Sequence, residues 1–319
     1  MKLTSSIVAA LCCILVICIC GPASAANIAF VSFHPGDNTP STNAANFLFT
    51  QAPDVGYTQA LTAAGHNVTR VVTQDVPLDA AKLAVLAASD LIIIGRSVAS
   101  AHYQQAPEHL FWNTTTTKPV IHMGGFAIRG GTGGGSRLGL YTNETLVDAA
   151  NPLKLIATNP SHPIFAGVSL DGTNTMVNNY STIPSLPFAP NTAQRGISVG
   201  TPIAAGGQIL GTVAAGDPTA GGTVIALFPP GTSMASNPAS VSAGYKLMFL
   251  SGTREAANQM LPAPAPTGTN AETSGIYDLT ADGNRMFLNA VNFMLAIPEP
   301  NTAMLLLVAV TGMSALRKR

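Results

Sequence analysis

A chain of 319 residues that is 47% hydrophobic and only 9% charged has enough apolar side chains to build one large core. Its 15 basic and 15 acidic side chains balance, so the sequence offers no basic field for binding nucleic acid. The remaining composition, rich in Ala, Gly, Thr, Ser and Asn, indicates a neutral, hydrogen-bonding surface.

The first 25 residues have the pattern of a secretory signal peptide. Lys2 is followed by an apolar run from Ile7 to Cys20 and then by the small residues Ala23, Ser24 and Ala25, which predicts cleavage before Ala26. All four cysteines lie inside that run, so the predicted mature chain has no disulfide, no cysteine nucleophile and no thiolate metal site.

Apolar runs and helix-forming segments alternate through the first half of the mature chain. The run Asp90–Gly95 is continuous and β-branched, as is typical of a parallel strand that is buried on both faces. Gly65 predicts a helix end, and Asp79 is expected in the first turn of the next helix. The predicted strands are 27–33, 67–73, 90–95 and 118–124, and the predicted helices are 57–64 and 78–89.

Such alternation predicts an α/β fold with a doubly wound, mostly parallel sheet. Right-handed crossovers would bring the loops after Phe33, Ile94 and Ile121 to one edge, where open α/β sheets bind ligands.

The pattern changes after Gly130 to a β-rich and loop-rich elaboration. Residues Arg129 to Arg137 include five glycines and are expected to form a mobile loop near the ligand edge. Strands are predicted at 208–214 and 222–228, long surface loops at 229–244 and 258–275, and a final helix at 280–295, capped by Thr280.

Candidate ligand-binding residues follow the predicted strands. His34 and His122 could face one crevice together with Arg96, and with Asp37 the two histidines could hold a divalent ion, or they could simply bond to loop backbone. Arg96 and Arg129 could bind a carboxylate or a pair of sugar hydroxyls, or an arginine here could pair with Asp37 or Glu108 to order the rim, which is the favoured interpretation. The predicted ligand-binding set is His34, Arg96, Ser97, His122 and Arg129, with no catalytic residue, metal site or cofactor.

The aromatic residues Tyr103, Phe111 and Trp112, with His102 and His109, could stack on a sugar ring or pack in the core, and packing is the favoured interpretation.

The body of the chain resembles the class I glutamine amidotransferase-like superfold, most nearly its ThuA-like branch. The motifs that carry this resemblance are Ile28–Phe33, Tyr57–His66, Asp90–Gly95, Lys118–Gly124, Ser161–Gly167 and the final helix. The resemblance implies a flavodoxin-like sheet. Catalytic members carry a cysteine in the turn after the strand that matches 119–121, whereas this chain has His122 and Met123 there, which excludes thiol chemistry by that route.

The last 22 residues resemble a PEP-CTERM sorting signal. Pro298, Glu299 and Pro300 precede an apolar run of 14 residues, 303–316, and the basic end Arg317–Arg319. The resemblance implies recognition by an exosortase-type enzyme, removal of the tail, and residence in the cell envelope or at the cell surface. The apolar run predicts a C-terminal hydrophobic helix that contacts the membrane at least transiently, although it is shorter than the ~20 residues of an unaided span. An ordinary C-terminal anchor is the alternative.

Three segments are therefore predicted: a signal peptide at 1–25, an amidotransferase-like α/β domain at 26–297, and a sorting signal at 298–319. The predicted function is that of an exported, surface-sorted protein whose catalytically degenerate domain acts as a binding or structural module, with extracellular polysaccharide as a candidate partner. The alternative is a ThuA-like enzyme that acts on a sugar derivative through His34, His122 and Arg96, without a cysteine nucleophile.

Overall fold

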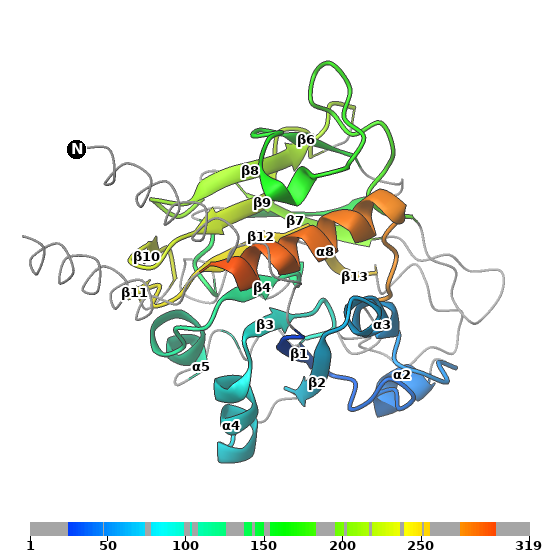
Figure 1. Ribbon diagram of the computed structural model, residues 1–319, viewed down its shortest axis with the longest axis vertical. Coiled ribbons are helices and arrows are strands. Elements are labelled where there is room, and N and C mark those ends of the chain that lie inside the picture. Colours follow the sequence, from blue (N-terminus) through cyan, green and yellow to red (C-terminus); the bar gives the residue numbers. More distant parts are fainter. Residues whose placement is uncertain are drawn as a thin grey trace, which may run out of the picture.

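The computed structural model of the chain (Figure 1) describes residues 25–46, 48–73, 78–98, 103, 108–125, 137–141, 144–149, 154–182, 195–200, 203–216, 219–236, 239–250, 252–255 and 275–297. The predicted signal peptide up to residue 24, most of the glycine-rich loop, residues 258–274 of the predicted loop 258–275 and the whole segment 298–319 lie outside these ranges.

A single large sheet forms the centre of the domain, in the order β13-β7-β9-β12-β4-β3-β1-β2. Five neighbouring strands of this sheet run parallel, which confirms the predicted parallel sheet and the four strands predicted for it, while the fifth strand, β12, was not predicted. These strands are β2 (Asn67–Val72), β1 (Asn27–Ser32), β3 (Leu91–Ile94), β4 (Val120–His122) and β12 (Lys246–Phe249).

The rest of the sheet is antiparallel and is larger than the sequence predicts. It begins with β9 (Thr223–Phe228), which pairs antiparallel with β12. Its other strands are β5 (Glu144–Ala149), β6 (Leu155–Ala157), β7 (Arg195–Gly200), β8 (Gln208–Val213) and β13 (Gly252–Glu255). The predicted loop 229–244 also contains a small hairpin of β10 (Ser233–Met234) and β11 (Ser240–Val241), because these residues pair across a short turn.

Alternate residues of each parallel strand enter two separate cores, one on each face of the sheet. On β1, Ile28 and Phe30 pack under α3 (Val55–Ala63) and α8 (Ala281–Ala296), a surface that we call the α8 face. Ala29 and Val31 enter the second core with α4 (Ala80–Ala88) and the π-helix Phe111–Thr115, on the α4 face. Figure 1 shows α8 lying across the sheet and α4 on the lower part of the domain. Helices on both faces confirm the doubly wound arrangement.

The helix ends follow local sequence signals. Thr280 caps α8, with its hydroxyl accepting from the N–H of Gly283 at 3.2 Å. Asp79 is the N-cap of α4 rather than a residue of its first turn, since its carboxylate accepts from the N–H of Lys82 at 2.8 Å. Gly65 has φ +93° just after α3, the left-handed conformation expected where a glycine ends a helix. Three short helices, α2 (Thr42–Asn46), α5 (Glu108–Leu110) and a 3-10 turn at Pro163–Phe165, complete the described part of the fold.

The loops after β1, β3 and β4 meet at one edge of the sheet, as predicted. The N–H of Phe33 donates to the carbonyl of Ser97 at 2.9 Å, and the N–H of Met123 donates to the carbonyl of Ile94 at 2.9 Å. We refer to this region as the carboxyl edge. None of the helices within the described ranges is long and apolar enough to span a membrane.

Replacing Gly283 with alanine is expected to destabilise the fold by about 1 to 3 kcal/mol, the usual cost of overpacking. A Cβ there would overlap the carbonyl oxygen of Tyr180, although alanine is the better helix former. Urea unfolding measures the change, and Gly172→Ala, where a Cβ meets nothing within 4 Å, is the control. Equal stability of the two variants would contradict the predicted clash.

Candidate functional site

His34 and Ser97 are in contact at the carboxyl edge, where the loops after β1 and β3 meet. The two side chains are fully buried, and Nε2 of His34 lies 3.1 Å from Oγ of Ser97. Nδ1 of His34 accepts the backbone N–H of Ser41 at 3.1 Å, so the neutral ring carries its proton on Nε2. His34 therefore donates to Ser97, and in this state it cannot remove the proton of the Ser97 hydroxyl.

Arg96 is also buried, and its partner is an acid that the sequence did not indicate. Its Nη1 donates to the carbonyl of Ile276 at 3.0 Å and lies 3.3 Å from Oδ2 of Asp278. Arg96 thus has the structural role that was the favoured alternative, but its acidic partner is Asp278 rather than Asp37 or Glu108, because residues 275–278 pass directly over this loop. A Cβ at Gly275 would come within 2.8 Å of the backbone nitrogen of Ser97.

A small cavity lies beside the pair of Arg96 and Asp278 on the α8 face. Tyr57, Met123 and Tyr180 contribute to its wall. The space open to the centre of a water-sized sphere is about 10 Å³, enough for roughly one water molecule. The cavity is thus too small for a sugar ring.

His122 does not join this group. It pairs in register with Ile94 and Met248, both of which belong to the core on the α4 face, so its ring lies on the opposite side of the sheet from the Arg96 cavity. Neither ring nitrogen has a hydrogen-bond partner in the described part of the chain. Burial, and then the charge of Lys246, hold the pKa of His122 well below its ordinary value. The predicted crevice shared by His34, His122 and Arg96 is therefore not formed.

Lys246 is a buried cation that the sequence analysis missed. It begins β12 and is fully buried, and its ammonium group donates to the carbonyl of Trp112. Burial lowers the pKa of Lys246 to about 7. The sequence carried one usable signal, a lysine at the head of the apolar run Lys246–Phe249.

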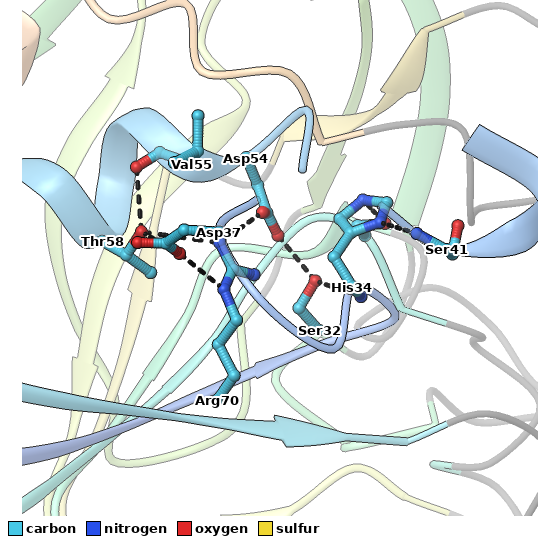
Figure 2. Close-up of polar contacts among 9 residues, drawn as sticks. Ser32, His34, Asp37, Ser41, Asp54, Val55, Thr58 and Arg70 are labelled. Atoms are coloured by element: carbon cyan, nitrogen blue, oxygen red, sulfur yellow. Dashed lines mark hydrogen bonds and ion pairs between the residues drawn. The ribbon is translucent and has the colours of Figure 1, made fainter. Parts of the chain in front are cut away.

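A second polar network, also missed, joins β1, β2 and the start of α3 (Figure 2). The hydroxyl of Ser32 donates to Oδ2 of Asp54 at 2.6 Å, and Nη2 of Arg70 lies 2.9 Å from Oδ1 of the same carboxylate. Nε of Arg70 then bonds to Oδ1 of Asp37 at 2.8 Å, and Thr58 donates to the same oxygen at 2.7 Å. The guanidinium of Arg70 thereby forms ion pairs with two carboxylates, those of Asp37 and Asp54.

This network removes Asp37 from the predicted metal site. Asp37 faces Arg70, whereas Nδ1 of His34 faces the backbone of Ser41. Across the residues that the structure describes, no three His, Cys, Asp or Glu side chains lie close enough together to hold a metal ion.

The aromatic cluster is part of the core, as favoured. Tyr103 and Trp112 are fully buried with ring centroids 5.7 Å apart, and burial raises the pKa of Tyr103. Neither ring can offer a face to a sugar. His102 and the candidate ligand residue Arg129 lie outside the described residues, as do Pro298, Glu299 and Pro300.

No protein-family model and no curated protein matches this chain. Among solved structures, it is similar to a ThuA-like protein from Bacteroides uniformis, with 10% identity and a TM-score of 0.43 over 86% of this chain and 94% of that chain. The likeness is too distant to support an argument, so the assignment of an α/β fold depends on the strand order and on the two helical layers.

Lys246 predicts an unusual pH dependence of stability. Between the folded pKa of about 7 and its ordinary value of 10.5, the unfolded chain binds a proton that the folded chain lacks. The free energy of unfolding should therefore rise with pH from 7 to about 9, by at most about 1.4 kcal/mol per pH unit from this group. Urea unfolding at a series of pH values measures the slope.

The Lys246→Met variant is expected to flatten this slope, whatever its effect on stability at a single pH. Lys82→Met, at a lysine whose side chain is 22% exposed, is the control and should keep the wild-type slope. An unchanged slope in Lys246→Met would show that Lys246 does not titrate in this range.

Proposed function

We propose that this chain is an exported protein, sorted to the cell surface by its C-terminal segment, whose α/β domain serves as a structural or binding module rather than as an enzyme. The observation that carries the proposal is that the candidate reactive side chains are buried and bonded or packed within the fold. Arg96 is held by Asp278, and His122 is enclosed on the other face of the sheet. His34 has its acceptor nitrogen occupied by a backbone N–H.

Catalysis by general acid and base needs groups that can reach one substrate, within hydrogen-bond distance of the atoms whose protons they transfer. The sheet itself separates His122 from Arg96. The cavity beside Arg96 admits about one water molecule. These two facts weigh against the alternative of a ThuA-like enzyme that uses His34, His122 and Arg96 together.

Export and sorting rest on the two ends of the sequence. The basic, apolar and small-residue pattern of 1–25 supports export, and Pro298–Arg319 supports recognition by an exosortase-type enzyme and transient contact with the membrane. A mature chain without thiols suits an oxidising location.

If the domain is a binding module, extracellular polysaccharide is the partner that we propose. Asp37 supports it, because this carboxylate is 43% exposed while Arg70 and Thr58 fix its position. A carboxylate held in place can accept hydrogen bonds from sugar hydroxyls at a reduced entropic cost. The neutral, hydroxyl-rich composition of the chain fits the same environment.

A second candidate function, hydrolysis by a serine nucleophile, is favoured by one contact, the 3.1 Å approach of His34 Nε2 to Ser97 Oγ. For His34 to act as the base, its proton would have to lie on Nδ1, so that Nε2 could accept the proton of Ser97. The hydrogen bond from the Ser41 N–H to Nδ1 would then have to break, and Nδ1 would need a new acceptor.

Retention of the exported protein on immobilised polysaccharides, including the host's own extracellular material, tests the proposed binding of polysaccharide. We expect retention on at least one polysaccharide and a loss of about tenfold in affinity for Asp37→Asn, equivalent to about 1.4 kcal/mol. Asp171→Asn, at an exposed acid elsewhere, is the matched control. Retention on no polysaccharide would contradict the binding role and leave only the structural role. Ester hydrolysis by the wild type that is abolished in Ser97→Ala would instead favour the serine hydrolase.

Replacing Pro298, Glu299 and Pro300 with three alanines, while keeping the apolar run and the basic end, tests the sorting signal. We expect the variant to remain in the membrane fraction at its unprocessed mass, because the proposed recognition triplet is gone. Mass spectrometry of cell fractions measures the result. If the protein instead reaches the same location and mass as the wild type, the segment is an ordinary anchor.

A further inference from the structure

The first two residues after the predicted cleavage point are fully hydrogen-bonded in the folded domain. Ala26 is 6% exposed; its N–H donates to Nδ1 of His66 at 3.4 Å, and its carbonyl accepts from Asn67 at 2.9 Å. The N–H of Asn27 donates to the carboxylate of Asp90 at 2.8 Å, and its carbonyl accepts the N–H of Asp90 at 2.7 Å. Every backbone polar group of these two residues thus has a partner.

Ala25, on the other side of the same peptide bond, is exposed. The hydrogen-bonded part of the chain therefore begins at Ala26, directly after the predicted cleavage point. A peptidase that binds its substrate as an extended strand needs free backbone groups on both sides of the bond it cuts. In the folded domain, the backbone groups of Ala26 and Asn27, which follow this bond, already have other partners.

We propose that the Ala25–Ala26 peptide bond is a processing site that is closed by folding, so that the signal peptide is removed before β1 takes its place in the sheet. The inference rests on the export part of the proposed function. The reaction is hydrolysis by a membrane-bound signal peptidase: water adds across the peptide bond, Ala25 keeps the carboxylate, and Ala26 keeps the amino group, which takes up a proton.

The position of β1 explains why folding closes the site. β1 pairs with β2 on one side and with β3 on the other, so lifting its first residues breaks bonds to two strands at once. Ile28, one residue further on, is 1% exposed in the core of the α8 face. Cleavage of a folded chain must pass through an opened state, and its rate falls with the population of that state.

Cleavage also changes the group that faces His66. The nitrogen of Ala26, an amide N–H in the precursor, becomes an ammonium group beside Nδ1 of His66. Burial already lowers the pKa of His66, and the new positive charge disfavours the protonated ring further. His66 should therefore titrate at a lower pH in the processed chain than in the folded precursor.

The test uses the full-length precursor in detergent, folded or unfolded in urea and diluted directly into purified signal peptidase. We expect the unfolded precursor to be cut between Ala25 and Ala26, and the folded precursor to be cut at least about tenfold more slowly, because opening is rare. The matched control carries about six Gly and Ser residues inserted after Ala25, which extend up to roughly 20 Å and move the scissile bond clear of the sheet. The folded control should be cut as fast as the unfolded one.

Equal rates for folded and unfolded wild type would overturn the inference while leaving the export proposal standing. Cleavage of neither form would reject the signal peptide itself, and the inference with it. Resistance of the folded control would also overturn the inference, since β1 could not then be the cause. NMR titration of His66 adds an independent readout: a pKa in the processed chain equal to or above that of the folded precursor would contradict the placement of the Ala26 ammonium.

Discussion

The burial of β1 from Ile28 to Ser32 is the constraint on which the rest of the domain depends. The side chains from Ile28 to Val31 alternate between two cores, and both edges of the strand are paired, so this stretch has no place for a polar side chain before Ser32. Polar residues then gather at that end, and each must find a partner inside the protein. Asp54 is fully buried, and an unpaired carboxylate there would be very costly. Ser32 and Arg70 offset that cost, and in doing so they fix β2 and the start of α3 against β1.

The same requirement explains why a sheet edge that commonly carries ligands is here occupied by internal pairs. Arg96 would be another uncompensated buried charge without Asp278, and Asp278 lies in the segment that enters α8. The Arg96 pair therefore joins the end of β3 to the final helix of the chain. Such a pair does not need to add net stability to be useful, because an alternative docking of residues 275–278 would separate these two buried charges. Because Arg96 holds the segment before α8 through Asp278, binding a substrate would require it to break that ion pair.

The features that could be predicted from the sequence are those with local causes. Asp90–Gly95 is a strand because its apolar run needs burial on both faces, and Gly65 and Thr280 mark helix ends through their own backbone and side chains. β12 was missed because it is short and begins with a lysine, a residue that is almost always exposed.

The partners within the candidate site could not be predicted, because they come from distant parts of the chain. Arg96 and Asp278 are 182 residues apart, and nothing near either one indicates the other. The contact between His34 and Ser97 was accessible to prediction only because parallel strands bring their ends together. The direction of His122 follows from the two-residue period of a strand, since Ile121 faces the other core, but that period does not say which face holds the cavity.

The first strand and the last helix of the domain begin and end within a residue or two of the segments predicted to flank the domain, and the sequence shows why. β1 begins one residue after Ala26, so no linker separates the predicted signal peptide from the sheet. At the other end, α8 closes at Ala296, and Ile297 has the extended values φ −73° and ψ 119°, as expected for a residue before proline. Pro298 and Pro300 lack the N–H groups that would continue the helix. The two prolines therefore prevent α8 from continuing as a regular helix into the apolar run of 303–316. In the sequence, the triplet Pro298–Pro300 thus lies between the end of α8 and the apolar run.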